Sequence, residues 1–294
     1  MTSKLLIPSP EERQACLRSM SVCGEDLIPD KFPGWEDVAK ANAEALLNAI
    51  ATELQDKNDC QANALATEEE ARQFLLTGNM IQSSRTYGYN ACEYLSSPSR
   101  VGADGGTTID SGVILMTQGI KALGVEPGLP TEESWKYGTY ERSQSRFVER
   151  AKSAVIVKSS VANHGPVPTA DKLPLVCAVG GSCHAGVFWS PKFEYRTYGG
   201  RKWKVWTTTP TSGGGHALAF GILVVWIAEK NSWWPCIWNS HGDGPILIPP
   251  ELWDVYCKRQ WNPFGGYMML PDKPEEKWED QRITGGGLWP KFVA

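Results

Sequence analysis

A cysteine at the start of a strongly helical run constrains this chain more than any other feature. Cys60 follows Asp59, a residue type that often caps helices, and it opens a run rich in Ala, Glu and Leu. Gly78 ends the run, as glycine commonly does at a helix C-terminus. Alanines on one face suit close packing against other backbone. The sequence therefore predicts a helix from Cys60 to Gly78, buried at the centre of a lobe.

The position of Cys60 suggests a reactive thiol. The first turn of a helix offers free backbone N–H groups and the positive end of the helix dipole, and both favour thiolate over thiol. We therefore expect a lowered pKa for Cys60, although the negative charge of Asp59 opposes that shift. A base is available in His216, which follows three glycines and precedes an apolar strand. Asn239 can orient that base, so the chain holds the residues of nucleophilic catalysis in a recurring order.

Bulk composition restricts the function classes. The 294 residues, 41% of them hydrophobic, can form one large domain or two packed lobes. A net charge of -4 gives no reason to expect nucleic acid or an anionic membrane as partner. No apolar run approaches the roughly 20 residues of a membrane helix. The N-terminal apolar segment is too short for a secretory signal, so we expect a cytoplasmic protein, not classically secreted.

The cysteines and histidines indicate neither a cofactor nor a metal. The chain has eight cysteines and no Cys-x-x-Cys pair, so reduced thiols are the default expectation, with a few bridges left open. Cys177, Cys183 and His184 lack the usual spacing of zinc ligands. We therefore predict no bound cofactor and no metal site.

Helical patterns come first and strand patterns later, which predicts an α+β fold. Four segments are expected: an N-terminal arm (1–34), a helical lobe (35–150), a β-rich lobe (151–271) and a C-terminal tail (272–294). The predicted helices cover 35–54, the run from Cys60 and 110–123, with a loop at 88–106 and an extended segment at 132–137. The predicted strands are 154–157, 173–179, the hairpin 193–198 with 201–206, the segment after His216, and 235–238.

Six ordered pieces of this sequence resemble the papain family of cysteine peptidases, over roughly residues 50–270. They are Cys60-x-Ala62, the Leu95-Ser96 to Gly106 stretch, Glu132 to Tyr137, Gly215-His216-Ala217, Asn239-Ser240-x-Gly242 and Gly266-Tyr267-Met268. Each piece alone is weak, but the six in this order are fairly specific. The resemblance, which leaves open a divergent phage-type member, implies two lobes with the cysteine on the helical one.

The resemblance also implies catalytic roles. Cys60 would attack the scissile carbonyl, and His216 would take the thiol proton and later protonate the leaving amine. Asn239 would accept the other N–H of the imidazole. Gln55 would donate to the oxyanion together with the Cys60 backbone N–H. Because Gln55 precedes the nucleophile by five residues and the family glutamine by six, Asn58 is a second candidate for that donor.

Substrate contacts follow from the same resemblance. Gly105 and Gly106 would let a substrate backbone pair with the cleft wall, since no Cβ intrudes. Ala217 would line the main specificity pocket. Two positions depart from the family: Gln61 stands where a tryptophan follows the nucleophile, and His241 replaces the tryptophan that shields the histidine–asparagine bond.

Three functions remain open at this stage. The first is a thiol peptidase that cleaves peptide or isopeptide bonds, and the residues favour an enzyme. The second is a papain-fold structural or assembly protein, such as a phage virion component, with weak or lost activity and with protein assembly partners. The third is a cell-wall amidase or endopeptidase. The separation of 156 residues between Cys60 and His216 (216 − 60) favours the papain-like reading, because amidase domains keep the histidine closer.

The hairpin from Lys192 to Trp206 interleaves basic and aromatic residues. This pattern can bind single-stranded nucleic acid through stacking and charge. A surface hairpin with alternating faces is the simpler interpretation, and a wall of the cleft or a docking surface for another protein is also open. We therefore expect a peptide or protein as the main partner.

Overall fold

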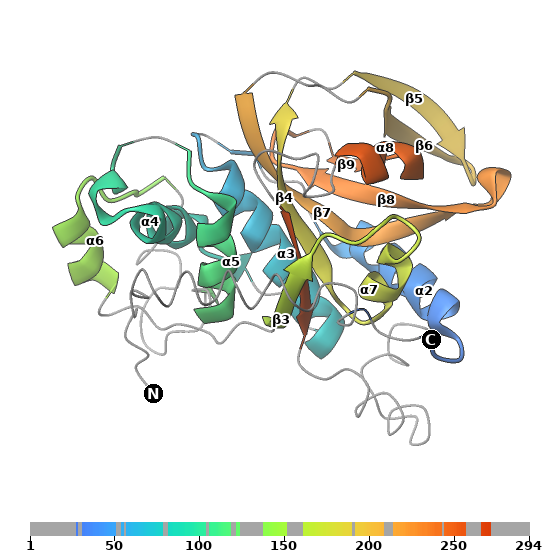
Figure 1. Cartoon of the computed structure of the whole chain (residues 1–294), viewed down its shortest axis with the longest axis horizontal. Coiled ribbons are helices and arrows are strands. Elements are labelled where there is room, and N and C mark those ends of the chain that lie inside the picture. The colour runs from blue at the N-terminus through green and yellow to red at the C-terminus, as the bar shows by residue number, and fades with distance from the viewer. Residues whose placement is uncertain are drawn as a thin grey trace.

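Helix α3 (Cys60–Thr77) runs through the middle of the molecule, between a group of helices and a large β-sheet (Figure 1). The computed structural model describes residues 28, 31–50, 54–55, 57–78, 82–103, 106–118, 122–123, 138–151, 161–189, 192–208, 214–242, 244–256 and 266–271. Helix α3 ends as expected, at Gly78, whose φ of 75° lies in the left-handed region that glycine adopts readily. The predicted helix from Cys60 to Gly78 is therefore confirmed.

The helical side of the molecule packs on one face of α3. Its elements are α4 (Arg85–Ser96), the 3₁₀ turn η1 (Pro98–Arg100), α5 (Ile109–Gln118), α6 (Gln144–Ala151) and the two-stranded sheet of β1 (Gln82–Ser83) and β2 (Ala122–Leu123). Gly88 in α4 faces Ala62 in α3, with room for ordinary van der Waals contact, so the two helices approach closely. A buried cluster that includes Leu65, Tyr87 and Phe147 forms the core of this lobe.

An eight-stranded sheet forms the other side. Its spatial order is β3-β10-β4-β7-β8-β9-β6-β5, and all neighbours are antiparallel except β6 and β9. The strands are β3 (Val161–Pro166), β4 (Ser182–Trp189), β5 (Phe193–Tyr198), β6 (Arg201–Trp206), β7 (Gly214–Ile227), β8 (Ser232–Asn239), β9 (Gly244–Leu247) and β10 (Gly266–Pro271). A 3₁₀ turn, η2 (Ala228–Lys230), joins β7 to β8. The α+β expectation and the hairpin of β5 and β6 are confirmed.

Three further helices pack on the sheet. Helix α2 (Trp35–Ala49) contacts α7 (Leu173–Ala178) and β7, and α8 (Pro250–Tyr256) contacts β8 (Figure 1). Leu46 of α2 belongs to the same buried cluster as Leu223 of β7. Helix α2 was predicted as part of the helical lobe, but its apolar face is buried against strands.

Other sequence-based expectations were wrong in detail. The predicted loop 88–106 contains most of α4, because Ser84 caps that helix through the Tyr87 N–H at 3.1 Å and tyrosine side chains bury it. The predicted strand 173–179 is helix α7, whose Pro174 fits a first helical turn. The helix predicted for 35–54 ends at Ala49, and the one predicted for 110–123 ends at Gln118.

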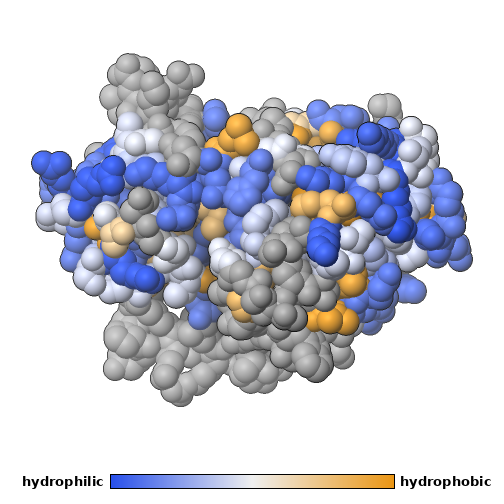
Figure 2. Space-filling model, turned by 90° about the horizontal axis from the view of Figure 1, so that it is seen from above, coloured by the Kyte–Doolittle hydropathy of each residue, from blue (hydrophilic) through white to orange (hydrophobic). Residues whose placement is uncertain are grey.

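Several expectations lie outside the described residues. These are the arm apart from residues 28 and 31–34, the extended segment 132–137, the strand 154–157 and the tail 272–294. Within the described part of the chain, no helix combines the length and apolar character that a membrane span needs. Figure 2 shows one face of the molecule as mostly hydrophilic, with small separate hydrophobic patches.

Candidate active site

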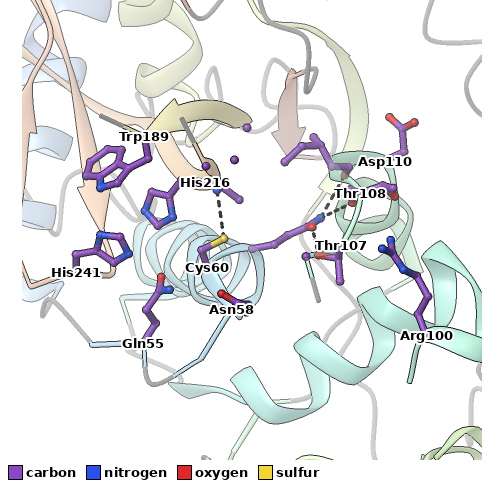
Figure 3. Close-up of a pocket in the computed structure, with 17 residues that line it drawn as sticks. Gln55, Asn58, Cys60, Arg100, Thr107, Thr108, Asp110, Trp189, His216 and His241 are labelled. Atoms are coloured by element: carbon purple, nitrogen blue, oxygen red, sulfur yellow. Dashed lines mark hydrogen bonds between the residues drawn. The ribbon is translucent and has the colours of Figure 1, made fainter. Parts of the chain in front are cut away.

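A cleft of about 860 Å³ lies where α3 meets the start of β7. Cys60 from the helical side and His216 from the sheet side both line it (Figure 3). The Ala217 N–H donates a hydrogen bond to Cys60 Sγ at 3.3 Å, which places the sulfur beside the His216–Ala217 peptide. Residues separated by more than 150 positions in the sequence therefore meet in one solvent-accessible space.

Cys60 is the first residue of α3, and Asp59 occupies the N-cap position. The Asp59 side chain makes no capping hydrogen bond; instead, its carboxylate accepts one from the Tyr140 hydroxyl. Lys57 Nζ lies 4.8 Å from the centre of the Tyr140 ring. The expected capping role of Asp59 is therefore wrong for its side chain, and the carboxylate is instead a fully buried charge next to the nucleophile.

The thiol of Cys60 is less acidic than its helix position predicts. Burial raises its pKa above the ordinary value, and the charge of Asp59 raises it further. The N–H groups of Ala217, Gln61 and Cys60 itself act in the opposite direction. The expectation of a lowered pKa was wrong because desolvation outweighs these backbone donors. Burial therefore works against the thiolate form of Cys60, so a neighbouring base would be needed to remove its proton.

His216 lines the same cleft, and its hydrogen bond defines its tautomer. Its Nε2 lies 2.9 Å from Asn239 Oδ1, and both side chains are buried. The amide oxygen only accepts hydrogen bonds, so Nε2 carries the proton and Nδ1 keeps a lone pair. Strand β7 brings His216 beside β8, where Asn239 is the last residue. The arrangement leaves Nδ1 as the ring nitrogen that can take a proton from the thiol.

Two aromatic rings cover this pair. His241 stacks on His216 with ring centres 4.3 Å apart, and the Trp189 ring centre lies 4.7 Å from that of His216. Trp189 also contacts His241 edge-on at 5.6 Å. Sequence reasoning noted that the shielding tryptophan was replaced by His241, but it missed Trp189. Together these rings limit the access of water to the bond between His216 and Asn239.

The strand register explains why Trp189 was missed. In the pairing of β4 with β7, Val187 lies opposite His216, and Trp189 is two residues further along β4. Residues two apart share one face of a strand, so Trp189 is a diagonal neighbour of His216. Its direct partner is Gly214, where an added Cβ would meet nothing within 4 Å. The open space at Gly214 does not require glycine, so only the strand pairing could have pointed to Trp189.

Gln55 lies in the cleft lining, but both ends of its amide are already bonded. Its Nε2 donates to the Lys57 carbonyl at 2.8 Å, and its Oε1 accepts from the Ser240 hydroxyl. The Gln55 N–H also donates to the Ser240 carbonyl at 2.9 Å. Asn58 lines the same cleft, and Figure 3 shows it directly beside Cys60. Gln55 ties the loop before α3 to Ser240, directly after β8, and both Gln55 and Asn58 stay candidates for the oxyanion donor.

Gln61 has a different role from the tryptophan it replaces. Its Oε1 accepts a hydrogen bond from the Thr107 hydroxyl, and its Nε2 donates to the Thr108 carbonyl at 2.9 Å. An added Cβ at Gly112 would clash with the Gln61 amide, so the glycine makes room for it. Gln61 thereby fixes one wall of the cleft to the nucleophile helix.

The predicted substrate contacts are partly described. Gly106 lines the cleft and is exposed, with open space where a Cβ would be. Ala217 lines it too, and it packs with Ile109, Tyr267 and the partly exposed Cys60 in one apolar cluster. Gly105 lies outside the described residues. The assigned roles of these residues stay predictions.

Removing the charge of Asp59 is expected to make Cys60 more reactive. The negative charge of Asp59 helps to raise the pKa of Cys60, so the neutral side chain of the Asp59→Asn variant should lower that pKa. The rate of Cys60 alkylation by iodoacetamide is measured by intact-protein mass spectrometry across a range of pH. The variant should reach half of its maximal rate at a lower pH than the wild type. Tyr140→Phe keeps the charge and is the matched control. An unchanged midpoint in Asp59→Asn contradicts this account of the site.

Removing Trp189 is expected to weaken catalysis without affecting substrate binding much. A ring over a protonated imidazole contributes on the order of 1–2 kcal/mol when it is desolvated, so Trp189→Ala lowers kcat about tenfold. KM changes little, since the indole stabilises His216 and not the substrate. Trp189→Phe retains a ring and most of kcat. Equal losses in the Phe and Ala variants contradict a shielding role.

The likeness to known proteins lies in the fold and not in the sequence. No protein-family model matches this sequence, and no curated protein matches it. A crystal structure of Amb a 11 from ragweed, a cysteine protease and pollen allergen in its proform, matches with a TM-score of 0.51. That match has 17% identity and covers 83% of this chain and 66% of that chain. This chain has a papain-like fold.

Two other proforms are similar to this chain. Procathepsin B S9 from Trypanosoma congolense matches at 15% identity, over 93% of this chain and 85% of that one, with a TM-score of 0.47. The digestive procathepsin L 3 of Tenebrio molitor larvae matches at 14% identity, over 88% of this chain and 89% of that chain, with a TM-score of 0.42. This chain spans slightly less than two thirds of the Amb a 11 proform. The papain-like fold rests on the Amb a 11 match, and the roles of single residues are proposals from the geometry above.

Proposed function

We propose that this protein is a thiol peptidase of papain-like type, in which Cys60, His216 and Asn239 cleave peptide or isopeptide bonds. The observation that carries the proposal is that Cys60 and His216 line one cleft and that the buried Asn239 bonds to His216. Cys60 Sγ sits against the Ala217 N–H at 3.3 Å, and His216 bonds to Asn239 at 2.9 Å. A partly exposed thiol near an oriented base is a constellation that supports acyl transfer.

The first half of the reaction forms a thioester. As Cys60 Sγ attacks the carbonyl carbon, the thiol proton passes to Nδ1 of His216, and a tetrahedral oxyanion forms. When the C–N bond breaks, the imidazolium returns that proton to the leaving amine. Asn239 keeps the ring in orientation, because its Oδ1 accepts from Nε2 throughout. The acyl group then stays bonded to Cys60.

The second half releases the acid. Water attacks the thioester carbon and gives up a proton to His216, and the C–S bond then breaks. His216 returns the proton to the sulfur, which regenerates the neutral thiol favoured by burial. The Cys60 N–H, at the start of α3, and the side chain of Gln55 or Asn58 are proposed as donors to the oxyanion in both halves.

The raised pKa of Cys60 favours one alternative. A papain-fold structural or assembly protein needs no activated thiol, and a cysteine whose pKa is raised suits that role. The oriented His216–Asn239 pair and the open cleft favour the peptidase, since packing alone requires neither. A reducing location, cytoplasmic or within a virion if the chain is phage-encoded, is also proposed. Among the described cysteines, Cys60, Cys92, Cys177, Cys183 and Cys236 are free thiols.

Cleavage of a peptide library tests the proposed function. The wild-type protein and its Cys60→Ala variant are incubated with a proteome-derived peptide mixture under reducing conditions, and new termini are identified by mass spectrometry. New termini should accumulate with the wild type and disappear with Cys60→Ala. Absence of new termini with folded wild type contradicts the peptidase and supports the structural alternative.

A further inference from the structure

Arg100 brings a positive charge to one arm of the cleft. It lines this arm together with Gly106, Thr107 and Asp110, and Figure 3 shows its guanidinium extending toward Thr107, on the side of Cys60 away from Trp189. Within the described part of the chain, the Arg100 side chain makes neither a hydrogen bond nor an ion pair. A guanidinium presents a planar fork of donors that matches a carboxylate.

The turn that carries Arg100 is held firmly. The Arg100 carbonyl accepts from the Ala103 N–H at 2.9 Å, and Gly102 has a φ of 85°. An added Cβ at Gly102 would clash with the backbone of Arg142. The Gly102 N–H also donates to the buried carboxylate of Glu93 at 3.1 Å. The base of the arginine side chain is therefore fixed relative to the cleft, although its tip is exposed.

The opposite charge in this arm is already engaged. Asp110 accepts a hydrogen bond from the Tyr267 hydroxyl. In Figure 3, Asp110 and Arg100 lie on opposite sides of Thr107 and Thr108. Apart from these two charged groups, the described lining of this arm is neutral. A ligand group that enters beside Thr107 therefore meets a cation.

The exposed backbone of Gly106 leaves room for an extended chain in this arm. Nothing lies within 4 Å of the position where its Cβ would be, so a peptide can pass close to it. Gln61 holds the neighbouring Thr107 in place, which keeps the wall at a constant distance from Cys60. A side chain of a peptide bound at Cys60 can thus be directed toward Arg100.

We propose that Arg100 forms a subsite that selects an acidic side chain, glutamate or aspartate, in the peptide bound at Cys60. This inference rests on the proposed function and adds a substrate class to it. The carboxylate would pair with the guanidinium, which has the matching fork of donors. A neutral residue of the same shape would leave that charge unpaired and bind less tightly.

Active-site labelling tests the subsite without requiring turnover. The reagents are blocked tripeptidyl chloromethyl ketones in which each position in turn carries Glu, Gln or Lys. The rate at which each reagent alkylates Cys60 is measured by intact-protein mass spectrometry. At one position, the Glu reagent should label about tenfold faster than the Gln reagent, since one charge-assisted pair distinguishes them. Arg100→Gln should abolish the difference, and Arg100→Glu should make the Lys reagent the faster one. Arg146→Glu, an exposed change of equal charge outside the cleft lining, should keep the wild-type preference.

The outcomes separate the subsite from the peptidase. Equal rates for the Glu and Gln reagents in the wild type overturn the subsite, as does a Glu preference that survives Arg100→Glu. If library peptides are cleaved without a preference for acidic residues, the proposed subsite is contradicted and the proposed peptidase function stands. An Arg100-dependent labelling preference without any peptide cleavage supports the subsite and contradicts the peptidase.

Discussion

Replacing His216 with alanine is expected to lower kcat/KM for peptide cleavage by about a thousandfold or more. Loss of the base in a nucleophile–base pair typically costs this much, because the two residues act as a unit. The effect should be large here, since burial raises the pKa of Cys60 and the thiol then depends on His216 to remove its proton. The loss should appear mainly in kcat.

The control for this variant is another histidine of the sheet. His164 lies on β3 and does not line the cleft, so His164→Gln should retain nearly all activity. His216→Ala and Cys60→Ala combined should be no worse than Cys60→Ala alone. Additive losses in the double variant, or less than about a tenfold loss in His216→Ala, would contradict a coupled pair.

Replacing Arg72 with alanine is expected to cost about 3–5 kcal/mol of unfolding free energy. Arg72 and Glu69 form an ion pair at 3.1 Å, and their side chains are 1% and 0% exposed. Arg72 also donates to the Ser182 hydroxyl on β4. Glu68 bonds to that same hydroxyl at 3.1 Å and to His184 Nδ1 at 2.9 Å. Without the arginine, two buried carboxylates lose their cation.

A surface pair provides the matched control. Lys40 and Asp37 are 3.9 Å apart on α2 with side chains 46% and 88% exposed, so Lys40→Ala should cost under about 0.5 kcal/mol. Urea unfolding followed by fluorescence measures both variants. A cost below about 1 kcal/mol for Arg72→Ala contradicts the idea that this buried network joins α3 to the sheet. Because α3 carries Cys60, the network also fixes the nucleophile relative to His216.

The sequence predicted the features that depend on local pattern or on chemistry. Cys60, His216 and Asn239 were singled out by residue type, neighbours and order; in the structure Cys60 and His216 line one cleft, and Asn239 bonds to His216. Helix α3 and the β5–β6 hairpin followed from a terminal glycine and from a Gly-Gly turn. These signals are short in range, so a single sequence contains them.

The sequence could not predict features that depend on tertiary burial. Composition suggested a loop where α4 lies, because the segment contains glycine and serine. The segment is a helix whose apolar contacts include those of the buried side chains of Tyr87, Tyr89 and Tyr94. The sign of the Cys60 pKa shift reversed because burial is set by elements far away in the chain. Trp189 required the register between β4 and β7, which local patterns do not specify.

The most direct test of the central claim is the rate of Cys60 alkylation by iodoacetamide at pH 7, compared between the wild type and His216→Ala. Cys60→Ala gives the background from the other cysteines, of which the described ones are buried. If His216 removes the thiol proton during attack, the wild type reacts about a hundredfold faster, within the usual range for general-base assistance. Equal rates in the two proteins would contradict the catalytic pair and leave a papain-like fold without a working nucleophile.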